Sequence, residues 1–206
     1  MHPEALNQDT KAIFRKLGCF KDFYLAGGTA LALQVGHRIS IDFDFFSKHD
    51  IPGDQLIEKL EKLFSRENVR VVMNHSEQLS TEVYGVKLTF AKYRLPVLLG
   101  FIQYQNVHMV TIPEIAAMKA YSAGRRPSLK DYVDLYYIVS EKHTNLPQII
   151  ELAQQKFKKE FEPRLFLEQL VYLKDVEDVP ILFLKRGITK KQIEAFFENE
   201  VKKINL

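Results

Sequence analysis

Residues 25–47 read LAGGTALALQVGHRISIDFDFFS, and this stretch decides the fold. Its first part completes an apolar run over 23–26 that stops at two glycines, which predicts a buried strand ending in a turn. Thr29 is then expected to cap a short helix over 30–35, which Gly36 closes. The order of strand, turn and helix indicates an α/β arrangement.

The rest of this stretch alternates between apolar and polar residues over 39–45, which predicts a half-buried strand. Its apolar face carries Ile39, Ile41, Phe43 and Phe45, and its polar face carries Ser40, Asp42 and Asp44. Aspartate is depleted in strands, and two carboxylates on one face repel each other unless a cation lies between them. Asp42 and Asp44 therefore suit Mg²⁺ (or Mn²⁺), which binds through one or two carboxylates plus substrate phosphates. The alternative is the solvated outer face of an edge strand.

Gly27 and Gly28 lie between the predicted buried strand and the start of a helix. Glycine lets the backbone approach a ligand closely, and the first turn of a helix offers free N–H groups to a phosphate. The spacing matches neither the dinucleotide-binding nor the P-loop pattern, and the alternative is a plain tight turn. Arg38 is in phase with Ser40 and the aspartates, so it could clamp a triphosphate or only neutralise them. His37 lies off that face and is interpreted as a structural cap.

Outside this stretch, the predicted elements fall into two groups. Helices are expected over 4–18 and 54–65, with strand-forming stretches over 69–73, 81–93 and 97–110. From Pro113 onward, only helices are predicted, over 113–123, 128–141, 147–160, 163–173 and 189–204. The pattern predicts an α/β (α+β) domain over 1–111, with a mixed sheet and flanking helices, and a helical domain over 112–206 docked on it.

The composition is that of an ordinary globular protein. The chain has 206 residues, of which 46% are hydrophobic, and its 15 Phe and 9 Tyr exclude a mainly disordered state. We expect Phe43, Phe45 and Phe46 to lie in the core rather than to stack on bases. A single cysteine, Cys19, excludes a disulfide framework and a cysteine-based zinc site. The sequence has no membrane-length apolar run and no signal-peptide pattern, so we expect a cytoplasmic protein. The net charge of +3 permits a nucleic-acid partner without indicating one.

A second block of charged residues follows the first at a distance. Lys119 is followed by Arg125, by Lys130 and Asp131 in succession, and by Asp134. Together with 25–47, this block resembles the AbiEii/AbiGii toxin family of the nucleotidyltransferase superfamily, which is of the DNA polymerase β type. The family's later motif is a Lys followed by Arg-x4-Lys-Asp-x2-Asp. The likeness covers roughly 20–185. The spacing from Lys119 to Arg125 is one residue longer than the motif, which leaves Arg126 as an alternative.

The resemblance implies a nucleotidyltransferase-type fold and specific roles for the residues of both blocks. Gly27, Gly28 and Thr29 would hold nucleotide phosphates, and Asp42 and Asp44 would bind Mg²⁺. Lys119 and Lys130 would contact phosphates, and Asp131 or Asp134 would position or deprotonate the acceptor. The expected nucleotide-binding residues are Gly27, Gly28, Thr29, Arg38, Ser40, Lys87 and Arg125.

The implied reaction is transfer of an NMP from an NTP to an acceptor hydroxyl, with pyrophosphate leaving. Related toxins suggest an RNA acceptor such as a tRNA end, a cognate antitoxin and a role in phage defence. The alternative is a catalytically inactive module that keeps the fold and binds nucleotide or protein.

A third carboxylate is expected on a neighbouring strand in enzymes of this type, and the sequence departs from that pattern. The candidate strand over 86–91 shows Lys87, Thr89 and Ala91 on its polar face and no acid. Three alternatives remain open: Asp131 or Asp134 substitutes, one metal suffices, or the chain binds nucleotide without turnover. Lys87 would contact a phosphate or pair with the two aspartates.

Overall fold

A computed structural model describes residues 1–123, 125–126 and 128–204. These residues form a seven-stranded sheet in the order β3-β4-β5-β2-β1-β7-β6. The strands are β1 (Tyr24–Ala26), β2 (Phe43–Ser47), β3 (Val69–His75), β4 (Gln78–Val83), β5 (Val86–Lys92), β6 (Phe101–Tyr104) and β7 (Val107–Val110). β1 pairs parallel with β7 and β2 pairs parallel with β5, whereas the other neighbours are antiparallel. The sheet is therefore mixed, as predicted.

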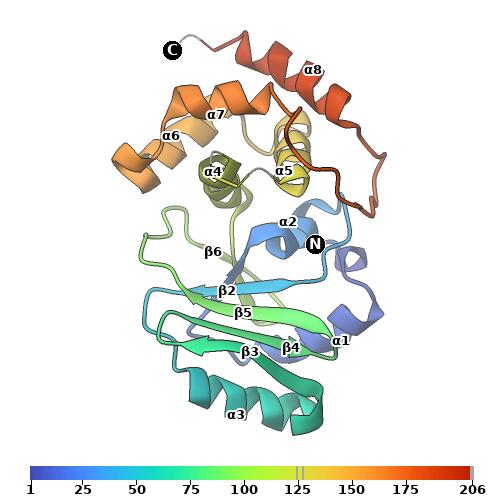
Figure 1. The fold of residues 1–206 in the computed structure, drawn as a ribbon, viewed down its shortest axis with the longest axis vertical. Helices are drawn as coiled ribbons and strands as arrows, with labels where there is room; N and C mark the ends of the chain where they lie inside the picture. The colour runs from blue at the N-terminus through green and yellow to red at the C-terminus, as the bar shows by residue number, and fades with distance from the viewer. Residues whose placement is uncertain (124, 127, 205–206) are drawn as a thin grey trace.

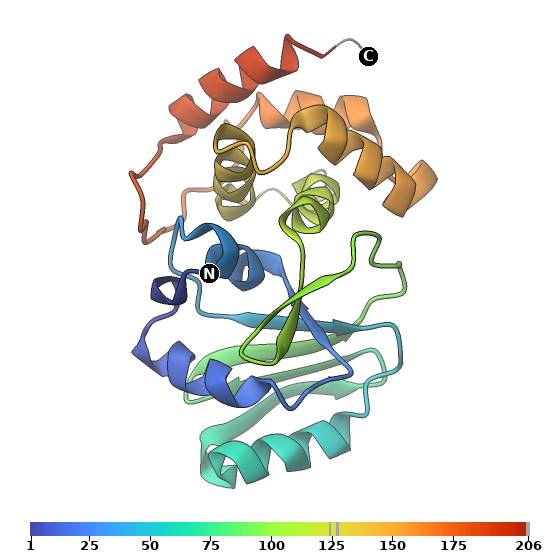
Figure 2. The same ribbon diagram turned by 180° about the vertical axis from the view of Figure 1, so that it is seen from behind.

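Helices lie on both sides of this sheet. They are α1 (Gln8–Leu17), α2 (Gly27–Val35), α3 (Gly53–Phe64), α4 (Ile112–Ala123), α5 (Leu129–Ser140), α6 (Leu146–Phe157), α7 (Pro163–Leu170) and α8 (Lys190–Val201). Short 3-10 turns cover Pro3–Ala5, Arg66–Asn68 and Lys158–Glu160. Figures 1 and 2 show α3 at one end of the molecule and the cluster α4–α8 at the other, with the sheet between them. The predicted helices are confirmed within a few residues, except that 4–18 is interrupted where Asn7 caps α1 through its bond from the Thr10 N–H.

The alternation in β2 separates the two faces of the sheet. Phe43 and Phe45 are completely buried in the core, as predicted. Phe46 is half-buried and lies on the opposite face with Asp44, where it packs against the edge of the core, so its prediction as a core residue is confirmed only in part. One side of the sheet is thus sealed by aromatic packing, and the other carries the acidic residues.

The predicted strand over 39–45 begins only at Phe43, which corrects that prediction. The backbone before it bonds to segments outside the sheet: the Ile39 N–H donates to the Leu182 oxygen and the Ser40 N–H to the Ala5 oxygen. Ile41 is consequently 50% exposed rather than on the buried face. Periodicity alone could not reveal partners that lie so far away along the chain.

Two tight turns divide the predicted strand-forming stretches into hairpins. Tyr84 and Gly85 have φ values of +50° and +77°, and Gln105 and Asn106 have +49° and +64°. Positive φ at both central residues is the hallmark of the type I′ turn, which matches the twist of paired strands. These turns set the antiparallel registers of β4 with β5 and of β6 with β7.

One hydrophobic core runs through both halves of the chain. Helix α2 is buried on nearly all sides because it packs against β1 and β2 on one side and against α4 and α5 on the other. A completely buried ion pair between Lys156 of α6 and Glu114 of α4 also joins the helices, with its charged atoms 2.6 Å apart. The change from strands to helices comes at Thr111, and the division into two domains there stays a prediction. Within the described residues, no helix is both long and apolar enough to cross a membrane.

Candidate active site

The two glycines occupy the point where β1 passes directly into α2. Gly27 has φ +69°, a left-handed conformation that costs little only for glycine. A Cβ on Gly27 would stand 3.1 Å from an Asp44 carboxylate oxygen, and one on Gly28 would stand 2.5 Å from the Arg38 guanidinium. Among the described residues, no side chain caps the first turn of α2, so its N–H groups remain available to a ligand.

Thr29 does not cap α2, which corrects the sequence prediction. It lies inside the helix, and its hydroxyl donates to the backbone oxygen of Asp42. The same hydroxyl lies 2.7 Å from the hydroxyl of Ser40. Thr29 therefore fastens the segment before β2 to α2, and this holds Asp42 beside the glycine turn.

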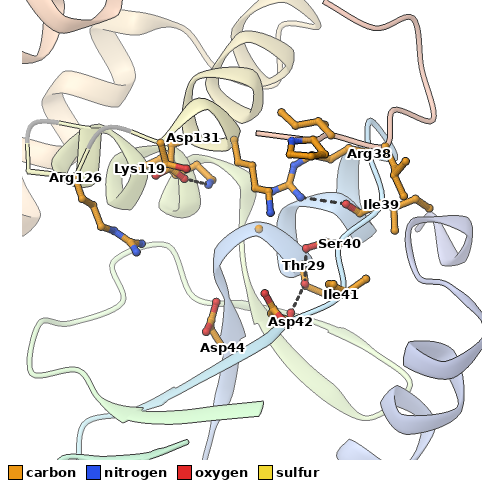
Figure 3. A pocket seen from close by; sticks show the side chains of 16 residues that line it. Thr29, Arg38, Ile39, Ser40, Ile41, Asp42, Asp44, Lys119, Arg126 and Asp131 are labelled. Atoms are coloured by element: carbon orange, nitrogen blue, oxygen red, sulfur yellow. Dashed lines mark hydrogen bonds and ion pairs between the residues drawn. The ribbon is translucent and has the colours of Figure 1, made fainter. Parts of the chain in front are cut away.

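Asp42 and Asp44 face one cavity of about 310 Å³ (Figure 3). Asp42 is exposed and Asp44 is half-buried. Burial raises the pKa of Asp44, and the charge of Asp42 raises it further, although Lys87, Arg126 and Lys119 partly offset both effects. The protein therefore leaves the negative charge of this pair incompletely balanced.

Basic residues line the opposite side of the cavity, as Figure 3 shows for Lys119 and Arg126. Lys130 lies exposed at its rim. Arg125, the predicted phosphate contact, lies elsewhere: its guanidinium donates to the backbone oxygens of Tyr121 and Glu160. The alternative, Arg126, lines the cavity.

Asp134 is the centre of a buried charge network below the cavity. Its carboxylate accepts two bonds from the Arg38 fork, at 2.7 and 2.9 Å, and one of 2.6 Å from His37 Nε2. Lys119 Nζ lies 2.6 Å from Asp134 Oδ2 and 2.6 Å from Asp131 Oδ1. Burial alone would raise the pKa of Asp134, but Lys119, Arg38 and the hydrogen bonds outweigh it and hold the pKa well below its ordinary value.

This network changes the predicted roles of several residues. Arg38 pairs with Asp134 instead of with Asp42 and Asp44, although it still lines the cavity. Asp134 is fully buried and engaged by three side chains, so it positions Lys119 and Arg38 and has no surface for an acceptor. Asp131 lines the cavity, and only one of its oxygens is bonded among the described residues. Asp131 is therefore the carboxylate of the two that can reach a ligand.

His37 is a member of this network that the sequence prediction treated as a simple cap. It is completely buried, and burial lowers its pKa in spite of the bond to Asp134. A neutral ring then carries its proton on Nε2, which donates to Asp134, while Nδ1 has no partner among the described residues. The spacing of residues in the sequence cannot show that a histidine is buried between two functional segments.

The position on β5 directly beside Asp44, where a third carboxylate would be expected, is occupied by Thr89. Thr89 pairs with Asp44 in the parallel register of β2 and β5. Lys87 lies exposed two residues earlier on the same face and lowers the pKa of Asp44 by its charge. Glu82, the nearest acid on β4, pairs with Arg70 at 2.6 Å. The described strand β5 therefore places no acidic residue beside Asp44.

The C-terminal segment supplies a wall that sequence reasoning missed. Pro180, Ile181 and Leu182 line the cavity, held by backbone bonds between this segment and residues 37–39. Of the predicted site residues, the cavity brings together Gly28, Thr29, Arg38, Ser40, Asp42, Asp44, Lys119, Lys130 and Asp131. Gly27 adjoins it behind Asp44, Lys87 acts on it by charge, and Asp134 lies below it.

Comparison with known proteins shows which family this chain is similar to. A family model described as the nucleotidyl transferase AbiEii toxin of a type IV toxin–antitoxin system matches residues 11–85 and 85–205. An uncharacterized protein from Aquifex aeolicus (strain VF5) is 31% identical over 195 residues, which are 90% of this chain and 89% of that protein.

Solved structures show the same fold at low identity. A candidate nucleotidyltransferase from H. pylori aligns with a TM-score of 0.59 at 16% identity, covering 96% of each chain. JHP933 from Helicobacter pylori gives a TM-score of 0.52 at 14% identity over 96% of this chain and 97% of that one. The antibiotic-resistance factor ANT(2'')-Ia gives 0.51 at 14% identity over 71% and 90%. With the family model covering nearly its full length, the chain belongs to the AbiEii nucleotidyltransferase toxin family.

Proposed function

We propose that this protein transfers an NMP from an NTP to an acceptor hydroxyl in a reaction that depends on Mg²⁺. The observation that carries the proposal is the approach of the Gly27–Gly28 turn to Asp44, with Asp42 facing the same cavity. A helix start that can accept phosphates thus lies against a pair of under-compensated carboxylates. Transfer of a phosphoryl group requires a binding site for phosphates and a binding site for the metal ion next to each other.

Asp42 and Asp44 fit a divalent cation. Two carboxylates suit Mg²⁺, which takes few protein ligands and completes its shell with waters and substrate phosphates. Among the described residues, no group of three or more His, Cys, Asp or Glu could hold a metal by itself, so bound triphosphate would supply further ligands. When bound, the ion would neutralise charge at the phosphorus under attack and on the leaving group.

The remaining residues of the site would bind the triphosphate and activate the acceptor. The N–H groups at the start of α2, with Lys119 and Arg126, hold and neutralise the triphosphate. Asp131 accepts the proton of the acceptor hydroxyl while Lys119 fixes its orientation. The acceptor oxygen bonds to the α-phosphorus, the bond from that phosphorus to the bridging oxygen breaks, and pyrophosphate leaves with the electron pair.

RNA is the acceptor that we propose, with a tRNA end as the leading candidate. Family membership supports a nucleotide substrate and an antitoxin partner. The exposed Lys130 and Arg126 at the cavity add positive charge where an RNA backbone would approach. Because the reaction uses NTPs and RNA, we expect it to take place in the cytoplasm, as the toxin of a toxin–antitoxin pair in phage defence.

The direct test is incubation of the protein with Mg²⁺, total RNA and NTPs labelled at the α-phosphate. Wild type should label RNA, a parallel reaction with γ-labelled NTP should not, and Asp42→Ala should lose labelling. Asp9→Asn, which changes an exposed carboxylate on α1, is the matched control. Equal labelling by wild type and Asp42→Ala would remove Asp42 from the mechanism.

A second candidate is a nucleotide-binding module without turnover. The observation that favours it is that Thr89, and not an acidic residue, lies beside Asp44 on β5, with Lys87 on the same face. This candidate requires nucleotide binding that persists in EDTA and yields no pyrophosphate, which the same preparation tests by calorimetry.

A further inference from the structure

A second cavity, of about 360 Å³, adjoins the candidate active site on the far side of Asp44. The two cavities share a wall made of Gly28, Asp44, Lys119, Arg126 and Asp131. A ligand that reaches from one cavity to the other would therefore pass the carboxylates and cations described above.

Four aromatic side chains contribute to the rest of the lining of this second cavity. They are Phe46, Tyr93, Tyr121 and Phe157, and they lie beside Ile115, Met118 and Ser122. Phe46 follows Asp44 by two residues in β2, so the same strand face that presents the carboxylates also presents an aromatic ring. Phe46 and Tyr93 meet edge to face, with ring centres 5.6 Å apart and planes at 67°, and so form a corner.

The opposite wall is rigid. Tyr121 stacks on Phe157 with ring centres 3.9 Å apart and planes at 7°, and the Arg125 guanidinium lies 3.6 Å from the centre of the Tyr121 ring. The Tyr121 hydroxyl donates to Glu160 at 2.6 Å. Arg125, which the sequence assigned to phosphate, therefore holds the Tyr121 ring in place against Phe157.

The cavity also offers a polar group to the edge of such a ligand. Within the part of the chain that the structure describes, the half-buried Tyr93 makes no hydrogen bond through its hydroxyl. Burial, reinforced by neighbouring Tyr24, Glu114 and Tyr121, raises the pKa of Tyr93, so the group stays a neutral donor.

We propose that this second cavity is a nucleobase subsite, in which Phe46 and Tyr93 contact the ring of a substrate nucleotide. The proposal rests on the proposed function, because the ligand must join a flat, largely apolar group to a phosphate that lies at Asp44. A nucleotide has that chemistry, and aromatic side chains bind every base through its π-face. The ring comes from the NTP or from the terminal nucleotide of the acceptor.

The first experiment separates ring binding from phosphate binding. Calorimetry with Mg²⁺ compares each of the four NTPs with inorganic tripolyphosphate for wild type, Phe46→Leu, Tyr93→Leu and Tyr93→Phe. Loss of a stacked aromatic ring should weaken binding of an NTP about tenfold or more and leave tripolyphosphate unchanged. Tyr93→Phe keeps the ring and should lose less than Tyr93→Leu. Tyr172→Leu, at an exposed tyrosine outside both cavities, is the control.

The second arm tests the acceptor. An RNA oligonucleotide that ends in 2-aminopurine should lose fluorescence on binding if its last base stacks in the cavity, and Phe46→Leu should abolish the change. An effect of the ring variants in either arm supports the subsite and identifies its source. Unchanged NTP affinity together with unchanged quenching would overturn it. Failure of the proposed function looks different, because wild type would then bind nucleotides and transfer no label to RNA.

Discussion

Gly27 and Asp44 lie so close that a methyl group on the glycine would stand 3.1 Å from a carboxylate oxygen of the aspartate. Gly27 directly follows β1, and the last residue of β1, Ala26, pairs with Asp44 in the antiparallel strand β2. This register brings a helix start and an acidic side chain to one point without any intervening side chain. The candidate active site is therefore a consequence of strand pairing as much as of the individual residues.

Gly27→Ala should damage the site more than the fold. Left-handed backbone costs a non-glycine residue about 1–2 kcal/mol, so the free energy of unfolding in urea should fall by that amount. NTP transfer should fall much further, because the new Cβ presses on Asp44. Gly85→Ala is the matched control, since Gly85 has φ +77° and nothing within 4 Å of a Cβ. Equal transfer by the two variants would contradict the assignment of the turn.

Asp134→Asn should destabilise the protein strongly. The substitution leaves Arg38 and Lys119 buried without their shared counter-charge, and breaking such a buried pair costs about 3–5 kcal/mol. Urea unfolding followed by circular dichroism measures the loss. Glu82→Gln, which removes an exposed ion pair with Arg70, should cost less than about 1 kcal/mol. A similar small loss for both variants would show that Asp134 is not the centre of the network.

His37 should make stability fall as the pH is lowered below neutrality. Burial lowers its pKa in the folded protein, so below about pH 6.5 the unfolded chain binds a proton that the folded chain does not. Its contribution is complete above pH 6.5 and declines by up to about 1.4 kcal/mol per pH unit until the folded pKa is reached. His37→Gln should remove this part of the slope when urea unfolding is measured between pH 5 and 8. An unchanged slope would mean that folding does not lower the pKa of His37.

Substitution of Arg126 should weaken phosphate binding, whereas substitution of Arg125 should not. A charge-assisted hydrogen bond contributes about 1.5–3 kcal/mol, so Arg126→Ala should weaken binding of inorganic tripolyphosphate about tenfold or more. Arg125→Ala should leave that binding nearly unchanged, because its guanidinium lies on Tyr121. Calorimetry with Mg²⁺ gives both values. The reverse order would restore Arg125 to the phosphate site.

Local patterns predicted the elements and the central pair of carboxylates. The glycine turn, the core positions of Phe43 and Phe45 and the order of strands and helices all follow from period and turn chemistry, which act over a few residues. Because these patterns act over only a few residues, they also explain where the sequence predictions were wrong. The strand was expected to start at residue 39 because alternation cannot show that Ile39 bonds to Leu182.

Contacts between distant segments were beyond sequence reasoning. The Arg38 fork bonds to Asp134, 96 residues away, because the packing of α2 on α5 leaves that carboxylate as its buried partner. Phe46 is only partly buried for the same kind of reason, since it lies on the second face of β2, opposite Phe43 and Phe45. Only the packed structure distinguishes Arg125 from its neighbour Arg126.

The most direct test of the central claim is a crystal soaked with Mn²⁺ and a non-hydrolysable NTP, examined by the anomalous scattering of manganese. We expect an anomalous peak between the carboxylates of Asp42 and Asp44, with the triphosphate reaching the Gly27–Gly28 turn. A bound triphosphate with manganese elsewhere, or a cation that leaves both aspartates without a bond, would contradict the account.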